Sequence, residues 1–417
     1  MESLHGFNLM IENTSPLKDI SVLDVSRILA GPSCTQLLGD YGADIIKVER
    51  PLNGDDTRYW GPPFLKDEAG NDSLESSYYL SANRNKRSIT INMAETDGQQ
   101  LILELAKESD IFIENFKVGG SKKFGLDYES LKKANPKLIY CSISGFGQTG
   151  PYANLPGYDF MIQAMGGIMS LTGPEDGDPY KVGVGIADVM CGMYACTAIL
   201  AALQHREQTG EGQYIDISLF DTQVAWLVNS AQNYLTSGRE PARYGNGHPN
   251  IVPYEVFPTS DGYFALAVGN DAQFKALCDV IKRPELAEDS DYQKNSSRIV
   301  NRKKLIPILR KTFIFEVTNY WLKLLKQQGV PCGPVNTVEQ VFEDPQVIHR
   351  GMKLKMPHPH FPDEEIDLIG NPVKFSRTPV SYRHSPPALG QHTNQVLSEL
   401  LQKTESEISN YRHNGII

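Results

Sequence analysis

The sequence has few cysteines for its length and no C-x-x-C pair. Six cysteines are scattered over 417 residues, which is too sparse for the disulfide framework of a small secreted protein. A chain of this size also has enough apolar material to build a large core without covalent cross-links. We therefore predict that all six thiols are reduced and that the protein works in a reducing compartment.

Positive charge is also in short supply. The chain has 40 Lys and Arg against 50 Asp and Glu, for a formal net charge of −10. Proteins that bind nucleic acids without regard to sequence draw most of their affinity from basic side chains placed against phosphates. We therefore expect no nucleic-acid partner, although a few locally placed cations can still hold a small anion.

The sequence shows no leader and no convincing membrane span. Residues 1–20 contain no Arg and carry acids at Glu2 and Glu12, unlike secretory or transit peptides. The most apolar segment, Val189 to Leu203, is short for a span and begins beside Asp188, so it predicts a buried core helix and no membrane association. We expect the protein in the cytoplasm, with the mitochondrial matrix as the alternative.

Several chemical motifs are missing. There is no G-x-S-x-G element of a serine hydrolase. His358-Pro359-His360 alternates like a metal-binding pair, but prolines surround it and no Cys or carboxylate cluster has ligand spacing, so we expect no metal. Asp55 and Asp56 in NGDDTR are interpreted as part of a polar loop.

From Lys18 to Phe146, β-branched apolar runs alternate with helical segments. Apolar strands separated by helices are typical of a parallel sheet covered on both faces. The sequence therefore predicts an α/β protein with a Rossmann-like large domain. The expected strands are residues 21–25, 43–50, 88–93, 110–116 and 137–144, and the expected helices are residues 33–42, 98–109 and 128–133.

The second half predicts a small inserted α/β domain. A hairpin signal surrounds Ser260-Asp261-Gly262, and amphipathic helices are expected over 272–281, 301–310 and 316–328. We therefore predict that residues 1–224 form the first part of the large domain, that 225–349 form the small domain, and that 350–417 return to the large domain. Helices are expected over 221–234, leading out of the sheet, and over 393–411.

Two segments at the expected strand ends bear on ligand binding, since ligands of such sheets lie beyond the carboxyl ends of the strands. Arg50 follows the second strand, where an Arg accommodates a phosphorylated ribose such as that of coenzyme A or NADP. A solvated Arg at a strand end is the alternative. GFGQTG at 145–150 matches a dinucleotide fingerprint, but Pro151 and Pro156 follow and no helix begins there, so we interpret it as a tight active-site turn.

Asp188 is the candidate for covalent chemistry. It precedes the apolar helix that begins near Val189, which predicts a helix N-cap. Burial raises the pKa of a carboxyl group there, whereas the helix dipole and cap N–H groups lower it. From the residues alone, a structural cap and a carboxylate nucleophile both remain open.

Motifs in order along nearly the whole chain resemble the family III coenzyme A transferases, the CaiB/BaiF family. The first is LDVSRILAGPSCTQLLGDYGADIIKVERP and the last is ALGQHTNQVLSEL; between them lie GDDTR, NRNKRSI, DIFIENF, YCSISGFGQTGPY, PGYDF, ADVMCGMYA and GVPCGPVN. Within the family the chain is most similar to succinyl-CoA:glutarate CoA-transferases and relatives that act on dicarboxylates.

The resemblance implies an enzyme that moves coenzyme A from an acyl-CoA donor to a carboxylic acid, with CoA thioesters as substrates and no permanently bound cofactor. It implies that Asp188, in the A-D-x-x-x-G motif, is the nucleophile and forms an aspartyl-acyl anhydride. It also implies a homodimer of interlocked rings. The residues that match coenzyme-binding positions are Leu29, Ala30, Arg50, Ile91, Asn92, Ala94, Asn115, Phe116, Lys117 and Lys123.

Further residues are expected around the acyl group. Tyr158 and Asp159 are candidates for positioning it, and Trp60 matches a tryptophan near the active site of formyl-CoA transferases. A dicarboxylate needs a cation for its distal carboxylate, and Arg58 and Arg84 are candidates.

Two departures from related branches narrow the substrate. Oxalate-specific members carry Gln where this chain has Leu29, and a run of glycines where it has only GNDAQ at 269–273. Racemases of this scaffold carry His at the position of Tyr158, and without it a two-base proton shuttle lacks one partner. An acyl-CoA racemase or epimerase stays the first alternative, and a non-catalytic CoA-binding protein the second.

Overall fold

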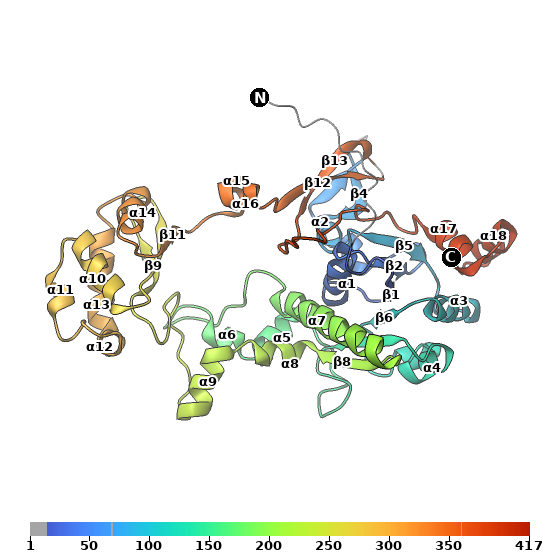
Figure 1. Ribbon diagram of the computed structural model, residues 1–417, viewed down its shortest axis with the longest axis horizontal. Coiled ribbons are helices and arrows are strands. Elements are labelled where there is room, and N and C mark those ends of the chain that lie inside the picture. Colours follow the sequence, from blue (N-terminus) through green and yellow to red (C-terminus); the bar gives the residue numbers. More distant parts are fainter. Residues whose placement is uncertain (1–14, 68–69, 360) are drawn as a thin grey trace. The chain divides into compact units, whose positions relative to one another are not determined.

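The computed structural model describes residues 15–67, 70–359 and 361–417 (Figure 1). The chain divides into two compact units. The first takes in the chain up to Gly166, then Gly183–Trp226 and Pro345–Ile417, and the second consists of Gly167–Val182 and Leu227–Asp344. The boundaries expected at 225 and 349 therefore fall at 227 and 344, and the segment 167–182, expected in the large domain, belongs to the second unit.

The first unit is built on a six-stranded sheet in the order β5-β2-β1-β6-β7-β8, of which Figure 1 labels all but β7. Every neighbouring pair is parallel, which confirms the predicted Rossmann-like α/β class. The strands are β1 (Ser21–Asp24), β2 (Asp44–Glu49), β5 (Lys86–Thr90), β6 (Ile111–Glu114), β7 (Ile139–Ser144) and β8 (Tyr214–Ser218). The sequence analysis missed β8, whose YIDIS residues are only partly buried because it is an edge strand.

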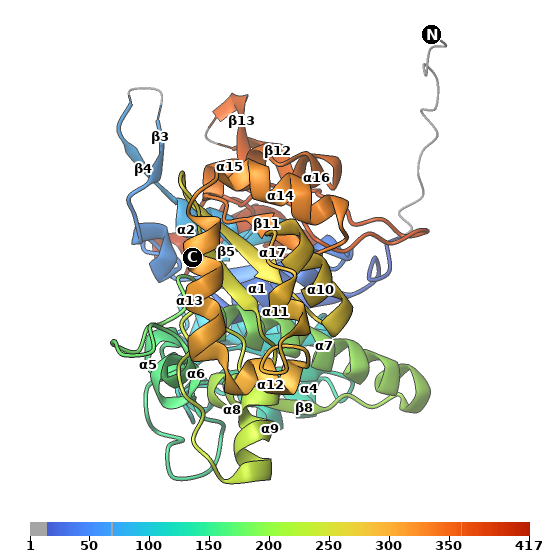
Figure 2. The same cartoon turned by 90° about the vertical axis from the view of Figure 1, so that its left-hand side faces the viewer.

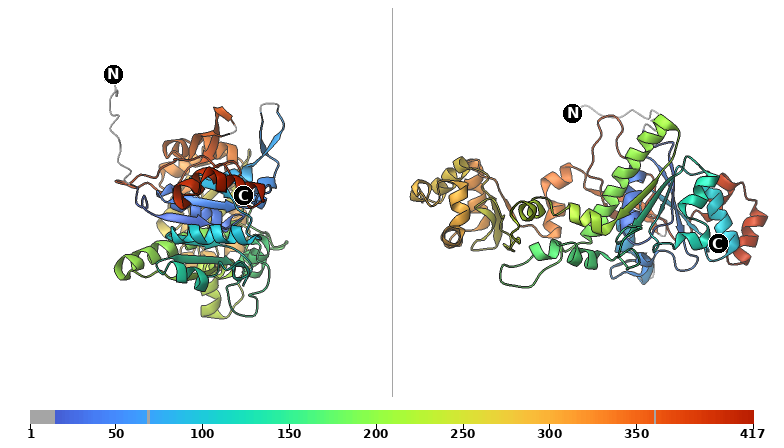
Figure 3. Two further views of the ribbon diagram at one scale, coloured as in Figure 1. Left: turned by 90° about the vertical axis from the view of Figure 1, so that its right-hand side faces the viewer. Right: turned by 90° about the horizontal axis from the view of Figure 1, so that it is seen from below.

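Two apolar layers cover the faces of this sheet, as its continuous buried strands require. One layer packs α1 (Ala30–Asp40), α7 (Ile186–Thr209) and α8 (Leu219–Ala225) against the strands. The other packs α3 (Thr96–Lys107), α4 (Tyr128–Ala134), α17 (Thr393–Leu401) and α18 (Glu405–His413); α17 and α18 are red in Figure 3. The helix expected over 393–411 is therefore two helices, with Gln402 between them in the left-handed conformation at φ 54°.

The long helix α7 is buried on one face only. Ala187, Cys191, Ala195 and Ile199 lie on the covered face, packed against α1 and β7. Among the described residues α7 is the helix long and apolar enough to cross a membrane, and 44% of its apolar window is buried. The expectation of a buried core helix therefore holds for one face of α7, while the opposite face is open in the single chain.

Shorter elements of the first unit surround the sheet. The hairpins β3 (Phe64–Lys66) with β4 (Asp72–Ser76) and β12 (Lys353–His358) with β13 (Phe361–Ile369) were not predicted. The remaining elements are η1 (Asp56–Tyr59), α2 (Ser77–Ser81), η2 (Ser121–Phe124), α5 (Asp159–Met165) and α16 (Pro345–His349). All six cysteines are free, and Cys332 is the one that is not fully buried.

The second unit has its own core around an antiparallel sheet in the order β11-β10-β9, and Figure 2 shows its helices α10 to α15 in yellow and orange. The hairpin predicted around Ser260-Asp261-Gly262 is present as β9 and β10. The helix expected over 221–234 is two helices, α8 in the first unit and α9 in the second. The elements are α6 (Ile168–Leu171), α9 (Val228–Ser237), β9 (Tyr254–Pro258), β10 (Tyr263–Ala267), α10 (Asp271–Val280), α11 (Glu285–Glu288), α12 (Asn295–Val300), α13 (Arg302–Phe313), α14 (Thr318–Gln327), β11 (Cys332–Pro334) and α15 (Val338–Glu343).

Candidate active site

A pocket of about 650 Å³ opens in the first unit, with Asp188 on its wall. Its wall comes from the segments that follow β1, β6 and β7, three neighbouring strands, as expected for a parallel sheet. The lining residues are Arg27, Ile28, Ala30, Asp56, Trp60, Tyr78, Asn115, Phe116, Lys117, Val118, Ile143, Ser144, Gly145, Ala153, Asn154, Leu155, Pro156, Gly157, Tyr158, Asp159, Phe160, Asp188 and Leu219.

Asp188 lies inside the first turn of α7 and is not the N-cap. The helix begins at Ile186, and the N-cap is Gly185, so the sequence prediction was wrong by one turn. Asp159 supplies the capping interaction from another helix, because its Oδ1 accepts a hydrogen bond of 2.8 Å from the Ala187 N–H. The Asp188 side chain is thereby released from capping and is available to the pocket.

The environment of Asp188 favours the protonated form. Burial is the largest effect and repulsion from the neighbouring Asp159 carboxylate adds to it, and together they raise the pKa of Asp188 to about 7. The dipole of α7 lowers the pKa of a carboxyl group in the first turn, but burial and Asp159 outweigh this effect at Asp188. A carboxylate whose pKa is raised in this way is a stronger base than an ordinary aspartate, and a correspondingly better nucleophile once it loses its proton.

Tyr78 is a pocket residue that the sequence analysis missed. Burial raises its pKa to about 12, and the nearby carboxylates of Asp188 and Asp159 contribute. Its ring packs edge-to-face on Trp60 at 5.2 Å between centroids. Both rings line the pocket that also holds Asp188 and Asp159.

The GFGQTG segment forms a turn after β7, as expected, and no helix begins before α5. Gly145, its first residue, is needed because two stretches of backbone touch there. A Cβ on Gly145 would lie 2.5 Å from the Cα of Gly157, which is closer than any side chain allows. Both glycines line the pocket, so this contact brings the loop with Tyr158 and Asp159 to the end of β7.

The structure brings together some of the expected coenzyme residues and leaves others outside the pocket. Ala30, Asn115, Phe116 and Lys117 line it, as do the expected acyl-positioning residues Trp60, Tyr158 and Asp159. Leu29, Arg50, Ile91, Asn92, Ala94 and Lys123 do not line it.

These other expected residues occupy different settings. Ile91 is fully buried in the core, and Asn92 donates to the Gly415 carbonyl at 3.4 Å. Leu29 is the N-cap of α1. Lys123 lies in η2. Ala94 lies in the exposed turn before α3.

The two arginines considered for the distal carboxylate of a dicarboxylate are held in buried ion pairs. Arg58 binds Glu49 at 2.8 Å with a fully buried side chain, and Arg84 binds Asp40 at 2.5 Å. Neither lines the pocket. The structure therefore assigns both guanidinium groups to the scaffold, and within the lining the cations are Arg27 and Lys117.

Arg50 and Arg27 share one carboxylate, which sequence reasoning treated as part of a polar loop. Asp56 accepts from Arg27 at 2.5 Å and from Arg50 at 2.8 Å. All three side chains are partly exposed, and Arg27 and Asp56 line the pocket. Arg50, the residue expected to bind the ribose phosphate, is therefore linked through Asp56 to Arg27 in the pocket lining.

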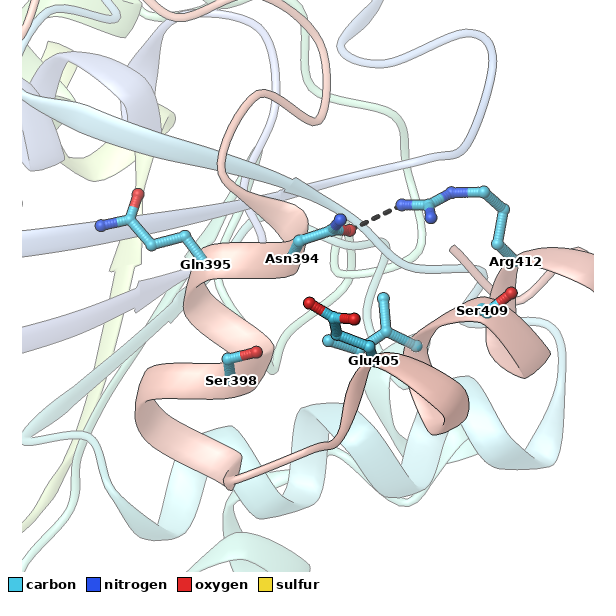
Figure 4. A pocket seen from close by; sticks show the side chains of 7 residues that line it. Asn394, Gln395, Ser398, Glu405, Ser409 and Arg412 are labelled. Atoms are coloured by element: carbon cyan, nitrogen blue, oxygen red, sulfur yellow. Dashed lines mark hydrogen bonds between the residues drawn. The ribbon is translucent and has the colours of Figure 1, made fainter.

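A second hollow, of about 370 Å³, lies between α17 and α18 (Figure 4). Arg412 donates there to the Asn394 side chain at 2.6 Å. None of the expected site residues lines it. Within the described ranges no group of three His, Cys, Asp or Glu is placed to hold a metal ion; His358 is buried in β12, and His360 lies outside the described residues.

Comparisons with known proteins show the family of the chain. The sequence profile of CoA-transferase family III matches residues 17–393. A mouse relative, "Succinyl-CoA:glutarate CoA-transferase", is 44% identical over 97% of this chain and 91% of its own length. A "Succinate--glutarate CoA-transferase" of Agrobacterium fabrum is 47% identical over 92% of this chain and 96% of its own.

A solved structure gives the same result for the fold. The crystal structure of a CaiB/BaiF family protein from Brucella suis superposes with a TM-score of 0.82 at 48% identity, covering 93% of this chain and 99% of that one. With the family profile spanning most of the chain, this protein belongs to CoA-transferase family III.

Proposed function

We propose that this protein transfers coenzyme A from succinyl-CoA or a similar donor to a dicarboxylic acid, with Asp188 as the nucleophile. The observation that carries the proposal is that Asp188 shares one pocket with Ala30, Asn115 and Lys117, which match coenzyme-binding positions. The names of the relatives support a dicarboxylate substrate. Arg27 and Lys117 are the cations in the lining that can receive a distal carboxylate.

The reaction begins when an Asp188 oxygen attacks the thioester carbonyl of the donor. The carbon–sulfur bond breaks, the CoA thiolate leaves, and an aspartyl-acyl anhydride remains. Backbone N–H groups of the Gly145–Gly157 wall are the candidates for stabilising the oxyanion. The burial of Asp188 is the feature that would protect the anhydride from hydrolysis by water.

The thiolate then attacks the Asp188 carbonyl carbon, which gives an aspartyl-CoA thioester and releases the donor acid. The acceptor carboxylate attacks this thioester, forming a new anhydride and regenerating the thiolate. Attack of the thiolate on the acceptor's acyl carbon yields the new acyl-CoA and free Asp188. One thioester replaces another, so the sequence of steps balances without ATP.

The proposal includes a homodimer. The open face of α7 carries Met193, Tyr194 and Leu200, with exposed fractions of 47%, 40% and 37%. A water-soluble chain rarely leaves such a stripe uncovered, and a second copy of the chain is the occupant we propose. Light scattering coupled to gel filtration tests this: a mass twice that of the chain is expected, and a monomer would contradict it.

The test of the function traps the intermediate. The protein is incubated with succinyl-CoA alone and quenched with hydroxylamine, and peptide mass spectrometry locates the hydroxamate, which we expect on Asp188. A second sample is quenched with acid and no hydroxylamine: a succinyl group found on a cysteine there, with no hydroxamate on Asp188 in the first sample, would show that a cysteine is the nucleophile. Deuterium uptake at the donor α-carbon in heavy water, without transfer, would instead favour a racemase.

A donor-by-acceptor matrix defines the substrate. Glutarate, itaconate, malate and oxalate are offered as acceptors, and valerate serves as the matched acid that has glutarate's chain length but only one carboxylate. We expect glutarate to exceed valerate at least tenfold in kcat/KM, because a charge-assisted hydrogen bond to a distal carboxylate is worth about 1.5–3 kcal/mol. Equal rates would exclude a cation that reads the second carboxylate.

A further inference from the structure

The turn between β1 and α1 holds a β-branched residue in a backbone conformation that such residues avoid. Ile28 has φ 72°, in the left-handed region where a branched side chain is strained. Ile28 and its neighbour Arg27 line the Asp188 pocket, as does Ala30 just beyond them. Some other part of the structure must therefore hold this turn in place.

A buried ion pair binds the backbone of the turn between β1 and α1. Lys47 and Asp55 are paired at 2.8 Å, and both side chains are fully buried. The Lys47 ammonium donates to the Ser26 carbonyl at 3.1 Å, and the Ile28 N–H donates to both Asp55 oxygens at 3.3 Å. The two charges thus bind the backbone on either side of Arg27.

Asn115 fixes the residue between these two contacts. Its Oδ1 accepts from the Arg27 N–H at 2.9 Å, and its Nδ2 donates to the Arg27 carbonyl at 2.7 Å. The turn is therefore bound at three successive residues, and its conformation is imposed by side chains that come from β2, from the loop before η1 and from the end of β6.

The same carboxylate also fixes η1. Asp55 is its N-cap and accepts from the Thr57 N–H at 3.0 Å and the Thr57 hydroxyl at 2.8 Å. Asp56, the first residue of this short helix, and Trp60, its C-cap, line the pocket. Asp55 thus joins two separate stretches of pocket wall, although it does not line the pocket itself.

The position of the turn affects the neighbourhood of Asp188. A Cβ on Gly192 of α7 would lie 2.5 Å from the Ala30 carbonyl oxygen, and one on Gly185 would lie 3.2 Å from the Leu29 side chain. The start of α1 and the first turns of α7 are therefore in close contact. A change of φ at Ile28 would move Leu29 and Ala30 against the helix that carries Asp188.

We propose that Asp55 is a positioning residue for the transfer reaction, holding Ile28 in the left-handed conformation and so fixing the coenzyme-binding edge beside Asp188. The proposal rests on the proposed function for its activity readout. The affinity for acyl-CoA, measured by calorimetry in an Asp188→Asn background, does not depend on the covalent chemistry and separates the two.

The test uses Asp55→Asn, which keeps the shape and removes the charge. We expect a loss of at least tenfold in kcat/KM for the donor and a weaker affinity for acyl-CoA, with no shift in the pH midpoint that Asp188 sets. Glycine at 28 adopts the left-handed conformation without strain, so Asp55→Asn combined with Ile28→Gly should recover most of the loss. A purely structural role for Asp55 would give no such rescue.

The control is Gln402→Gly, which relieves another left-handed residue, at φ 54°, away from the pocket lining. We expect it to leave the activity of Asp55→Asn unchanged. If Asp55→Asn does not fold, Ile28→Pro takes its place, since proline excludes positive φ and lacks the N–H while leaving both buried charges in place. A folded single variant with wild-type kcat/KM and affinity, or a double variant no more active than Asp55→Asn, would overturn the proposal.

Discussion

Asp188 and Asp55 are two aspartates in the same unit whose surroundings have opposite effects on them. Burial raises the pKa of both carboxyl groups. At Asp55 the Lys47 ammonium and the donors of Thr57 outweigh burial and lower the pKa to about 2. At Asp188 burial and the charge of another carboxylate, Asp159, act in the same direction and raise the pKa to about 7.

Burial raises the pKa of both groups, so the charge of the neighbouring side chain decides the outcome. A cation keeps Asp55 ionised as part of the scaffold, whereas a second carboxylate raises the pKa of Asp188. Asp55 is ionised at neutral pH, and its two oxygens accept hydrogen bonds from Lys47, Ile28 and Thr57, so it holds backbone in place and does not face a substrate. At Asp188 burial and the Asp159 carboxylate both favour the protonated form, and its side chain lies on a pocket wall. Its unfavourable charge can be relieved by forming a covalent bond to an acyl group.

The largest expected effect separates activity from stability at Asp188. Asp188→Asn should lower kcat for transfer by at least roughly 10³-fold, because a covalent nucleophile has no substitute. Its folded pKa of about 7 lies above the unfolded value of 3.8, so the carboxyl group costs stability that grows as the pH rises from about 4 to about 7 and stays constant above that. The variant should therefore be as stable as the parent near pH 4 and progressively more stable up to pH 7, with no further gain at pH 8, as measured by thermal melting. Retained turnover would refute the nucleophile.

The opposite pattern is expected at the Lys47–Asp55 pair. Lys47→Met leaves Asp55 buried without its cation, which should cost about 3–5 kcal/mol at pH 7. The depressed pKa of Asp55 makes its stabilisation present above pH about 4 and lost as the pH falls toward 2. The difference between variant and parent in urea unfolding should therefore shrink in acid.

Lys66→Met is the matched control for that experiment, because Lys66 pairs with Asp72 at an exposed site, with side chains 60% and 54% accessible. Such surface pairs contribute about 0–1 kcal/mol. A loss in Lys47→Met no greater than in this control would show that the buried pair does not support the fold.

The smallest effect concerns the coupling of the two pocket carboxylates. In the parent, kcat/KM for the donor should rise with pH through about 7, as Asp188 ionises. Asp159→Asn removes the repulsion, and its carbonyl oxygen can still accept from the Ala187 N–H. In Asp159→Asn the rise of kcat/KM with pH should therefore occur at lower pH, while the maximal kcat/KM changes little. An unchanged pH dependence would mean that burial alone sets the pKa of Asp188.

Much of the fold could be predicted from local pattern, because buried parallel strands are apolar throughout and helices separate them. β1, β2, β6 and β7 were expected close to where they lie. β8 was missed because, as an edge strand, it alternates polar and apolar residues. The break at Gln402 was missed because only a positive φ, and no Gly or Pro, marks it.

Individual residues of the site could be predicted where a motif in the sequence identifies them. Asp188, Asn115 and Lys117 were named from the sequence, and the structure places them on one pocket wall. Arg58 and Arg84 were considered for the acceptor because a sequence shows charge but not pairing. Both prove to be bound to buried carboxylates.

The sequence by itself determined the sheet, its helical covering and the aspartate at the start of the apolar helix, since these depend on residue type and period along the chain. Only the tertiary structure decided which carboxylates have a cation beside them. Lys47 meets Asp55, and Asp159 meets the start of α7, because the ends of separate elements converge at one edge of the sheet. Electrostatic energy depends on distance in space, and distance along the chain does not record it.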